Sequence, residues 1–126
     1  MRHQIGGKKL GRSRNQRVGL RRTLINQLLE HERIETTRAK AEAIRGAAEK
    51  LITMARAGNR ASSLQMVHAR RLAAARLSNP GMVKKLFDEI APRYADYEKG
   101  GYTRMLKLGP RLGDAAEMVM LELIGE

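Results

Sequence analysis

Several residue types are scarce in this chain of 126 residues, and each scarcity excludes a class of protein. The chain has no cysteine, which excludes disulfide bonds and thiolate metal sites and gives no reason to expect secretion. It has no tryptophan, one phenylalanine and three tyrosines, too few aromatic rings for a base-stacking platform that binds single-stranded nucleic acid. No apolar run approaches the ~20 residues that a membrane-spanning helix requires.

Acidic residues are missing from the start of the chain, where the first carboxylate is that of Glu30. Residues 1–22 carry eight lysines and arginines, which supply +8 of the formal net charge of +12 and leave +4 for residues 23–126. Such a segment cannot stabilise itself by burial, so we expect a mobile cationic arm when it is alone. A polyanion would supply the missing charge, which favours nucleic acid as the partner, with an anionic membrane surface as the other candidate.

The length predicts one domain, which we divide into a basic N-terminal arm over residues 1–14 and a single α/β domain over residues 15–126. The N-terminus has no apolar stretch of the kind found in a secretory signal. Glycines and lysines also interrupt the amphipathic face that an organelle transit peptide would need. The cytoplasm is therefore the expected compartment.

Helical periodicity predicts four helices after the arm. Ser13 or Asn15 caps the first, whose arginines are expected to extend the arm along its outer side as one basic surface. A second helix is predicted to begin after Thr36 or Thr37 and to close at Gly58-Asn59. A third begins at Ser62 or Ser63 and carries Leu64, Val67 and Leu72. A fourth begins at Asn79-Pro80, stops before Pro92, and buries Val83, Leu86, Phe87 and Ile90.

Three segments read as β-strands because they are rich in strand-forming residues: Arg33–Thr37, Tyr102–Leu108 and Glu117–Ile124. The last two are expected to pair antiparallel as a hairpin around the loop at Gly109–Asp114, and the first can join them. The predicted fold class is therefore α/β (α+β), a two-layer domain. It has a small mixed sheet of about three strands covered on one face by helices.

The candidate functional residues are cations rather than catalytic groups. A second acid-free region runs from Lys50 to Phe87 and contains eight lysines and arginines. Without aromatic platforms, binding is expected to depend on Arg and Lys side chains that contact phosphate and sugar. The candidate RNA-binding residues are Arg2, His3, Lys8, Lys9, Arg12, Arg14, Arg17, Arg21, Arg22, Arg70, Arg71, Arg104 and Arg111.

No motif in the sequence supports catalysis or a cofactor. His31-Glu32-Arg33-Ile34-Glu35 resembles the zinc-protease pattern but has glutamate where the second histidine belongs, so we expect no metal site. Gly6–Gly11 lacks the spacing of a nucleotide-binding phosphate loop. The sequence predicts neither a small-molecule substrate nor a membrane partner.

Segments in order along almost the whole chain resemble those of the bacterial large-subunit ribosomal protein seventeen family. They include Gly6–Arg12, Leu28–Thr37, Ala48–Ile52, Lys85–Tyr94, Gly100–Arg111 and Gly113–Ala116. The resemblance implies a two-layer α/β domain that binds 23S rRNA in the large subunit, near the peptide exit side and beside neighbouring large-subunit ribosomal proteins. It also implies a structural role in assembly, as a monomer within the ribosome and without enzymatic activity.

Two other readings have less support from the residues. A DNA-binding nucleoid protein would need a recognition helix presented by a dimer, and neither a clear helix-turn-helix nor heptads are present. An RNA-modifying enzyme would need a catalytic constellation that the sequence does not contain.

Overall fold

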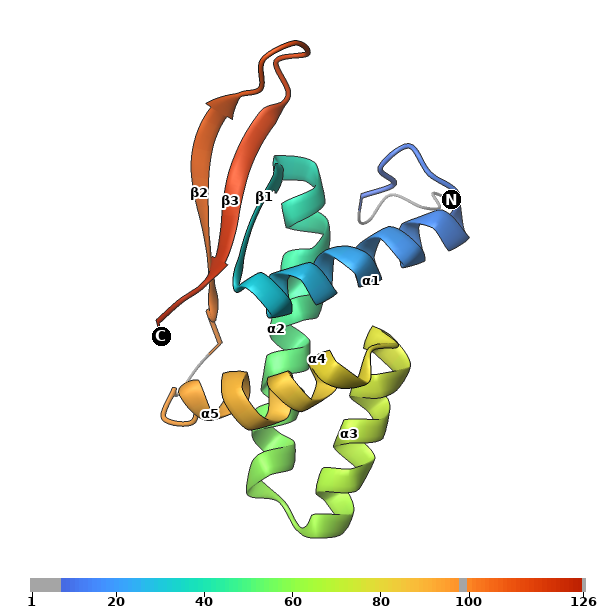
Figure 1. The fold of residues 1–126 in the computed structure, drawn as a ribbon, viewed down its shortest axis with the longest axis vertical. Helices are drawn as coiled ribbons and strands as arrows, with labels where there is room; N and C mark the ends of the chain where they lie inside the picture. The colour runs from blue at the N-terminus through green and yellow to red at the C-terminus, as the bar shows by residue number, and fades with distance from the viewer. Residues whose placement is uncertain (1–7, 98–99, 126) are drawn as a thin grey trace, which may run out of the picture.

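The computed structural model describes residues 8–97 and 100–125 of the chain. In Figure 1 the long helix α2 runs along the middle of the molecule, with the sheet on one side and α1 and the α4–α5 segment crossing it. The elements follow the order α1 (Arg14–His31), β1 (Arg33–Thr37), α2 (Arg38–Arg60), α3 (Ser63–Leu77), α4 (Pro80–Lys85), the π-helical turn η1 (Leu86–Ile90), α5 (Ala91–Arg93), β2 (Thr103–Pro110) and β3 (Glu117–Leu123).

Side-chain caps define where the helices begin, as the sequence predicted. Ser13 accepts a hydrogen bond from the Gln16 backbone N–H, and the Gln16 side chain accepts one from the Ser13 N–H, so the two residues form a capping box. The other N-caps are Thr37, Ser62 and Asn79, each of which accepts a hydrogen bond from a backbone N–H in the first turn of its helix.

The three strands form one sheet in the order β1-β3-β2, and both pairings are antiparallel. The predicted hairpin of the last two strands is confirmed, but the sheet is antiparallel throughout rather than mixed. The reason is topological: β1 lies beside β3 and runs opposite to it, so no parallel crossover is needed. A register shift between Lys107 and Gly109 marks a bulge in β2, which continues to Pro110 within the stretch predicted as loop.

Helices cover one face of the sheet, which confirms the two-layer architecture. Along β3 the side chains of Val119, Leu121 and Leu123 are buried against this helical layer, and the residues between them are only partly covered. The tip of the β2–β3 hairpin projects beyond the helices at the top of Figure 1. No described helix combines the length and the apolar character that a bilayer crossing requires.

Helix α3 packs through two alanines and a leucine near its end, and the large apolar residues named from the sequence are exposed. Leu64 is 81% exposed, and Val67 and Leu72 are also exposed. The buried side chains of α3 are instead Ala69, Ala73 and Leu77. Small side chains are buried here because α2 and α3 approach closely: a Cβ added at Gly58 of α2 would lie 2.9 Å from the Cβ of Ala69 of α3.

The fourth predicted helix continues through Pro92 instead of stopping before it. Its interior residues Val83, Leu86, Phe87 and Ile90 are all buried, as predicted. The turn η1 is π-helical, and the backbone N–H of Ala91 bonds to the carbonyl of Leu86, five residues earlier. This wider turn lets the chain pass the proline ring, which has no N–H to donate, before the helix ends at Tyr94.

Glu32 joins the end of α1 to the α4–α5 segment. Its backbone is left-handed, with φ of 66°, and its N–H closes α1 on the Leu28 carbonyl. The Glu32 carboxylate accepts a hydrogen bond from Arg93 and lies 3.5 Å from Lys85 Nζ. The hydrogen bond from Arg93 is the main reason that the pKa of Glu32 lies below its usual value, and the positive charges of Arg93 and Lys85 add to the effect.

The substitution Glu32→Gln is expected to destabilise the fold by about 1 kcal/mol at neutral pH, a small value because the side chain is 35% exposed. The pKa of Glu32 is lower in the folded state, so its ionised form stabilises the fold above the unfolded pKa, and this contribution is lost as the pH falls through the folded pKa. Urea unfolding of the wild type and of Glu32→Gln, from pH 7 to pH 3, measures this contribution. The free energies of unfolding of the two proteins should converge below about pH 4. A constant difference would contradict the ion-pair assignment.

Candidate nucleic-acid interface

The N-terminal half of α1 carries the densest group of candidate cations. Arg14, Arg17, Arg21 and Arg22 lie within about 140° of one another around the helix axis. The same face buries Ile25 further along the helix. These arginines therefore do not lie on the outer side of α1, as expected from the sequence. They continue the core-facing side of the helix where its N-terminal half extends past α2 (Figure 1).

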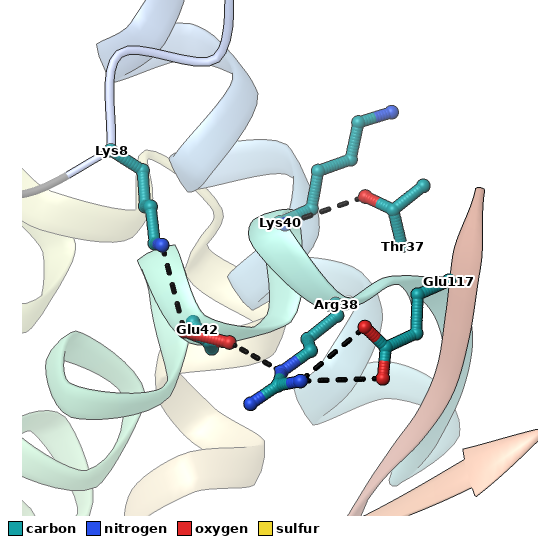
Figure 2. A network of polar contacts seen from close by, with 6 residues as sticks. All are labelled: Lys8, Thr37, Arg38, Lys40, Glu42 and Glu117. Carbon is teal, nitrogen blue, oxygen red and sulfur yellow. Dashed lines mark hydrogen bonds and ion pairs between the residues drawn. The ribbon is translucent and has the colours of Figure 1, made fainter.

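One ion pair joins a side chain of the described part of the arm to the body of the protein. Lys8 Nζ lies 3.6 Å from the Glu42 carboxylate, which also accepts a hydrogen bond of 2.8 Å from Arg38 Nε. Arg38 Nη1 in turn contacts Glu117 at the start of β3 at 3.3 Å (Figure 2). All four side chains are at least a third exposed, so this network positions the arm without stabilising it strongly.

The other arm cations have no acidic partner within the part of the chain that the structure describes. Lys9 and Arg14 are exposed. Arg12 Nη1 donates to the Leu10 carbonyl at 2.6 Å. Arg21 Nη2 donates to the Lys8 carbonyl at 3.1 Å, which ties the arm to α1. Apart from Lys8, these side chains keep a positive charge that no described carboxylate neutralises.

Arg22 links α1 to the end of α3. Its Nε donates to the Arg76 carbonyl at 3.0 Å, and Asn26 Nδ2 donates to the Leu77 carbonyl at 3.0 Å. These bonds satisfy carbonyls at the C-terminus of α3, which have no partner within the helix. The contact brings Arg76 beside the arginines of α1. Arg76 was not among the candidate residues, because its position depends on the path by which α3 returns to α1.

The second acid-free region of the sequence does not remain acid-free in space. The fold places Asp88 2.7 Å from Arg70 Nη2, and the Arg70 guanidinium also lies 4.8 Å from the centroid of the Phe87 ring. Arg56 and Arg60 donate to backbone carbonyls around Ala95. Of the two candidates in this region, Arg71 is exposed and has no ionic partner among the described residues.

The two candidates on the β2–β3 hairpin each pair with a nearby carboxylate. Arg104 Nε donates to Glu122 Oε1 at 2.8 Å across the strands. Arg111 Nε donates to Asp114 Oδ1 at 3.0 Å within the hairpin loop, which holds the pKa of the Asp114 carboxyl far below its usual value. Both arginines are about half exposed, so each remains within reach of a larger polyanion.

Two predicted site residues, Arg2 and His3, lie outside the described residues. Within the described part of the chain, no three histidine, aspartate or glutamate side chains come together in a way that could hold a metal ion. The candidate interface is therefore defined by charge and exposure. Its densest part consists of the cations of residues 8–22 together with Arg76, and Arg71 is a further exposed candidate on α3.

This is a small α/β domain whose cations gather on the arm and on the helix that follows it. Such an arrangement is typical of basic proteins that bind nucleic acid. Comparison with known sequences identifies the family: a family model described as ribosomal protein L17 matches residues 20–124. The chain belongs to this family, which confirms the resemblance. The family is one of structural ribosomal proteins rather than enzymes.

Curated relatives resemble the chain over almost its whole length. A protein of Trichlorobacter lovleyi named large ribosomal subunit protein bL17 is 48% identical over 126 residues, covering 100% of this chain and 95% of the relative. Proteins of the same name from Thermoanaerobacter sp. and Clostridium perfringens are each 48% identical, over 95% and 94% of this chain.

Proposed function

We propose that this chain is a structural component of the large ribosomal subunit and that it binds 23S rRNA in the bacterial cytoplasm. The observation that carries the proposal is the set of cations in residues 8–22 that lack a described acidic partner. Neutralising rRNA phosphates with these side chains would release condensed counterions and provide the main attraction. Family membership and the names of the relatives support the ribosomal assignment.

The two parts of the chain have different roles in rRNA binding. The arm and the first half of α1 follow the rRNA backbone, while the sheet and the remaining helices form a rigid support. Arg70, Arg104 and Arg111 make additional contacts that are weaker, because each must first separate from its own carboxylate. The protein acts as a monomer beside neighbouring large-subunit proteins on the peptide exit side, and it needs no cofactor.

Sedimentation of cell extracts tests the assignment. A tagged copy of the full chain is expected to sediment with large subunits on a sucrose gradient and to remain there after DNase treatment. RNase treatment should release it. Sedimentation with the nucleoid, or release by DNase, would instead support the DNA-binding reading. Crosslinks from Lys8 and Lys9 in intact subunits would then identify which rRNA segments lie beside the arm.

A further inference from the structure

A cleft of about 300 Å³ lies where α1, α2 and α3 converge. This volume is at the lower end of the range for small-ligand pockets. Two of the side chains that line it, Ile25 and Leu51, are buried, and Val18 is 48% exposed. The apolar lining comes from all three helices: Val18 and Ile25 of α1, Ala47 and Leu51 of α2, and Ala75 of α3.

Three arginines complete the lining of this cleft, and no carboxylate is among the described residues that line it. Arg21 and Arg22 each use one nitrogen to hold a backbone carbonyl, that of Lys8 and that of Arg76 respectively. Arg21 Nε is buried and makes no hydrogen bond among the described residues. Arg76 is exposed, and its side chain makes no hydrogen bond or ion pair among the described residues. The cleft therefore combines an apolar interior with an uncompensated positive rim.

The chemistry of this combination selects a ligand with an apolar flat part and an attached anion. A duplex backbone would use the arginines but leave the apolar interior empty. An aliphatic or aromatic side chain of a neighbouring protein would fill the interior but leave three charges unmatched. A nucleotide satisfies both requirements, because an unstacked base has an apolar face and its phosphate is anionic. RNA-binding proteins often accept splayed-out bases against apolar, aromatic or arginine side chains.

We propose that this cleft holds one nucleobase that has left its stack in the rRNA, with the adjoining phosphates bound by Arg21, Arg22 and Arg76. The inference rests on the proposed rRNA binding and adds a site for a single nucleotide. The alanines Ala47 and Ala75 are essential to it, since larger side chains at these positions would fill the space that the base occupies.

The variant Ala75→Leu tests the site because it fills the cleft without changing charge or helix propensity appreciably. Ala74→Leu is the matched control, since Ala74 is also exposed on α3 but does not line this cleft. We expect Ala75→Leu to weaken binding of the full chain to 23S rRNA between about fivefold and a hundredfold, the range for one stacked base. The salt dependence should be unchanged, and Ala74→Leu should bind within about twofold of the wild type.

Chemical probing of the same complexes provides a second measurement. Dimethyl sulfate and carbodiimide modify the Watson–Crick edges of accessible bases, so an enclosed base should be protected in the wild-type complex. That base should become reactive with Ala75→Leu and stay protected with Ala74→Leu. Equal binding and equal protection for both variants, with unchanged circular dichroism, would overturn the nucleotide site.

Two further outcomes distinguish a failure of the nucleotide site from a failure of rRNA binding as a whole. If Ala75→Leu binds naked rRNA normally but is lost from whole subunits, a neighbouring protein fills the cleft and the nucleotide proposal is wrong. If the wild-type chain shows no salt-dependent binding to 23S rRNA, the proposed function itself fails, whatever the variants do.

Discussion

Deleting residues 2–12 is expected to weaken 23S rRNA binding strongly and to flatten its dependence on salt. The deletion removes four cations, Arg2, Lys8, Lys9 and Arg12, but keeps the Ser13–Gln16 capping box at the start of α1. The slope of log K against log salt is negative, and loss of four phosphate contacts should reduce its magnitude by about three. The ratio of wild-type affinity to deletion affinity for 23S rRNA should fall by between tenfold and a hundredfold when the salt is raised from about 50 to about 200 mM. Filter binding over this salt range measures both quantities.

A charge-matched control distinguishes an arm effect from an effect of net charge. Four cations on the body of the protein, each paired with a described carboxylate, are changed to glutamine: Arg38, Arg70, Arg104 and Arg111. This variant loses the same formal charge, and its salt slope should fall by less than half as much as that of the deletion. An equal fall in both would mean that the rRNA contact is spread over the body. No fall in the deletion would contradict the arm mechanism.

The deletion should leave the fold nearly unchanged, because the described arm residues are linked to the body by few and weak contacts. The Lys8–Glu42 ion pair joins side chains that are 46% and 37% exposed, and such pairs contribute about 1 kcal/mol or less. The other link is the bond from Arg21 to the Lys8 carbonyl. The described arm residues therefore contribute little to the folding energy, as expected for a segment that a partner would stabilise.

Local chemistry made much of the fold predictable from the sequence. Ser13, Thr37, Ser62 and Asn79 are N-caps because each offers a side-chain oxygen to backbone N–H groups that the helix leaves free. The buried face of α3 cannot be read from its large apolar residues, since Leu64 and Val67 are exposed. Contact with Gly58 instead selects alanine, and this depends on how closely two helices approach. The path through Pro92 was missed because a π-helical turn has no simple sequence signal.

The candidate site could be predicted only in part, because charge is visible in sequence but pairing is not. The arm cations stood out by their distance from any acid along the chain. Arg70 and Arg104 gave no local sign of a partner, yet the fold brings to each a carboxylate from 18 residues further along the chain. Arg111 differs, because its partner Asp114 lies only three residues away. In the opposite direction, Arg76 gained a place in the interface only through the contact of Arg22 with its carbonyl. Such long-range encounters follow from topology, which the local pattern does not contain.

Phe87 is one of the largest fully buried side chains, and its loss should strongly destabilise the support for this interface. It is 1% exposed in η1, where its ring lies under the Arg70 guanidinium. A Cβ added at Gly58 would come within 3.2 Å of the same ring, which shows how tightly α2 packs there. Phe87→Ala would leave a cavity in this tight packing, and we expect a loss of about 3–5 kcal/mol in the free energy of unfolding. Domains of this size have only about 5–15 kcal/mol in total.

Guanidinium chloride unfolding of Phe87→Ala measures this loss, and Leu64→Ala is the matched control. Leu64 is larger than the alanine that replaces it but is 81% exposed, so its removal should change stability by less than about 0.5 kcal/mol. The fraction of Phe87→Ala that remains folded should bind 23S rRNA with the wild-type salt slope, because its cations are unchanged. A lower slope at temperatures where the variant is fully folded would mean that the helical core also sets the geometry of the phosphate contacts. Unchanged stability would contradict the packing described for α2 and η1.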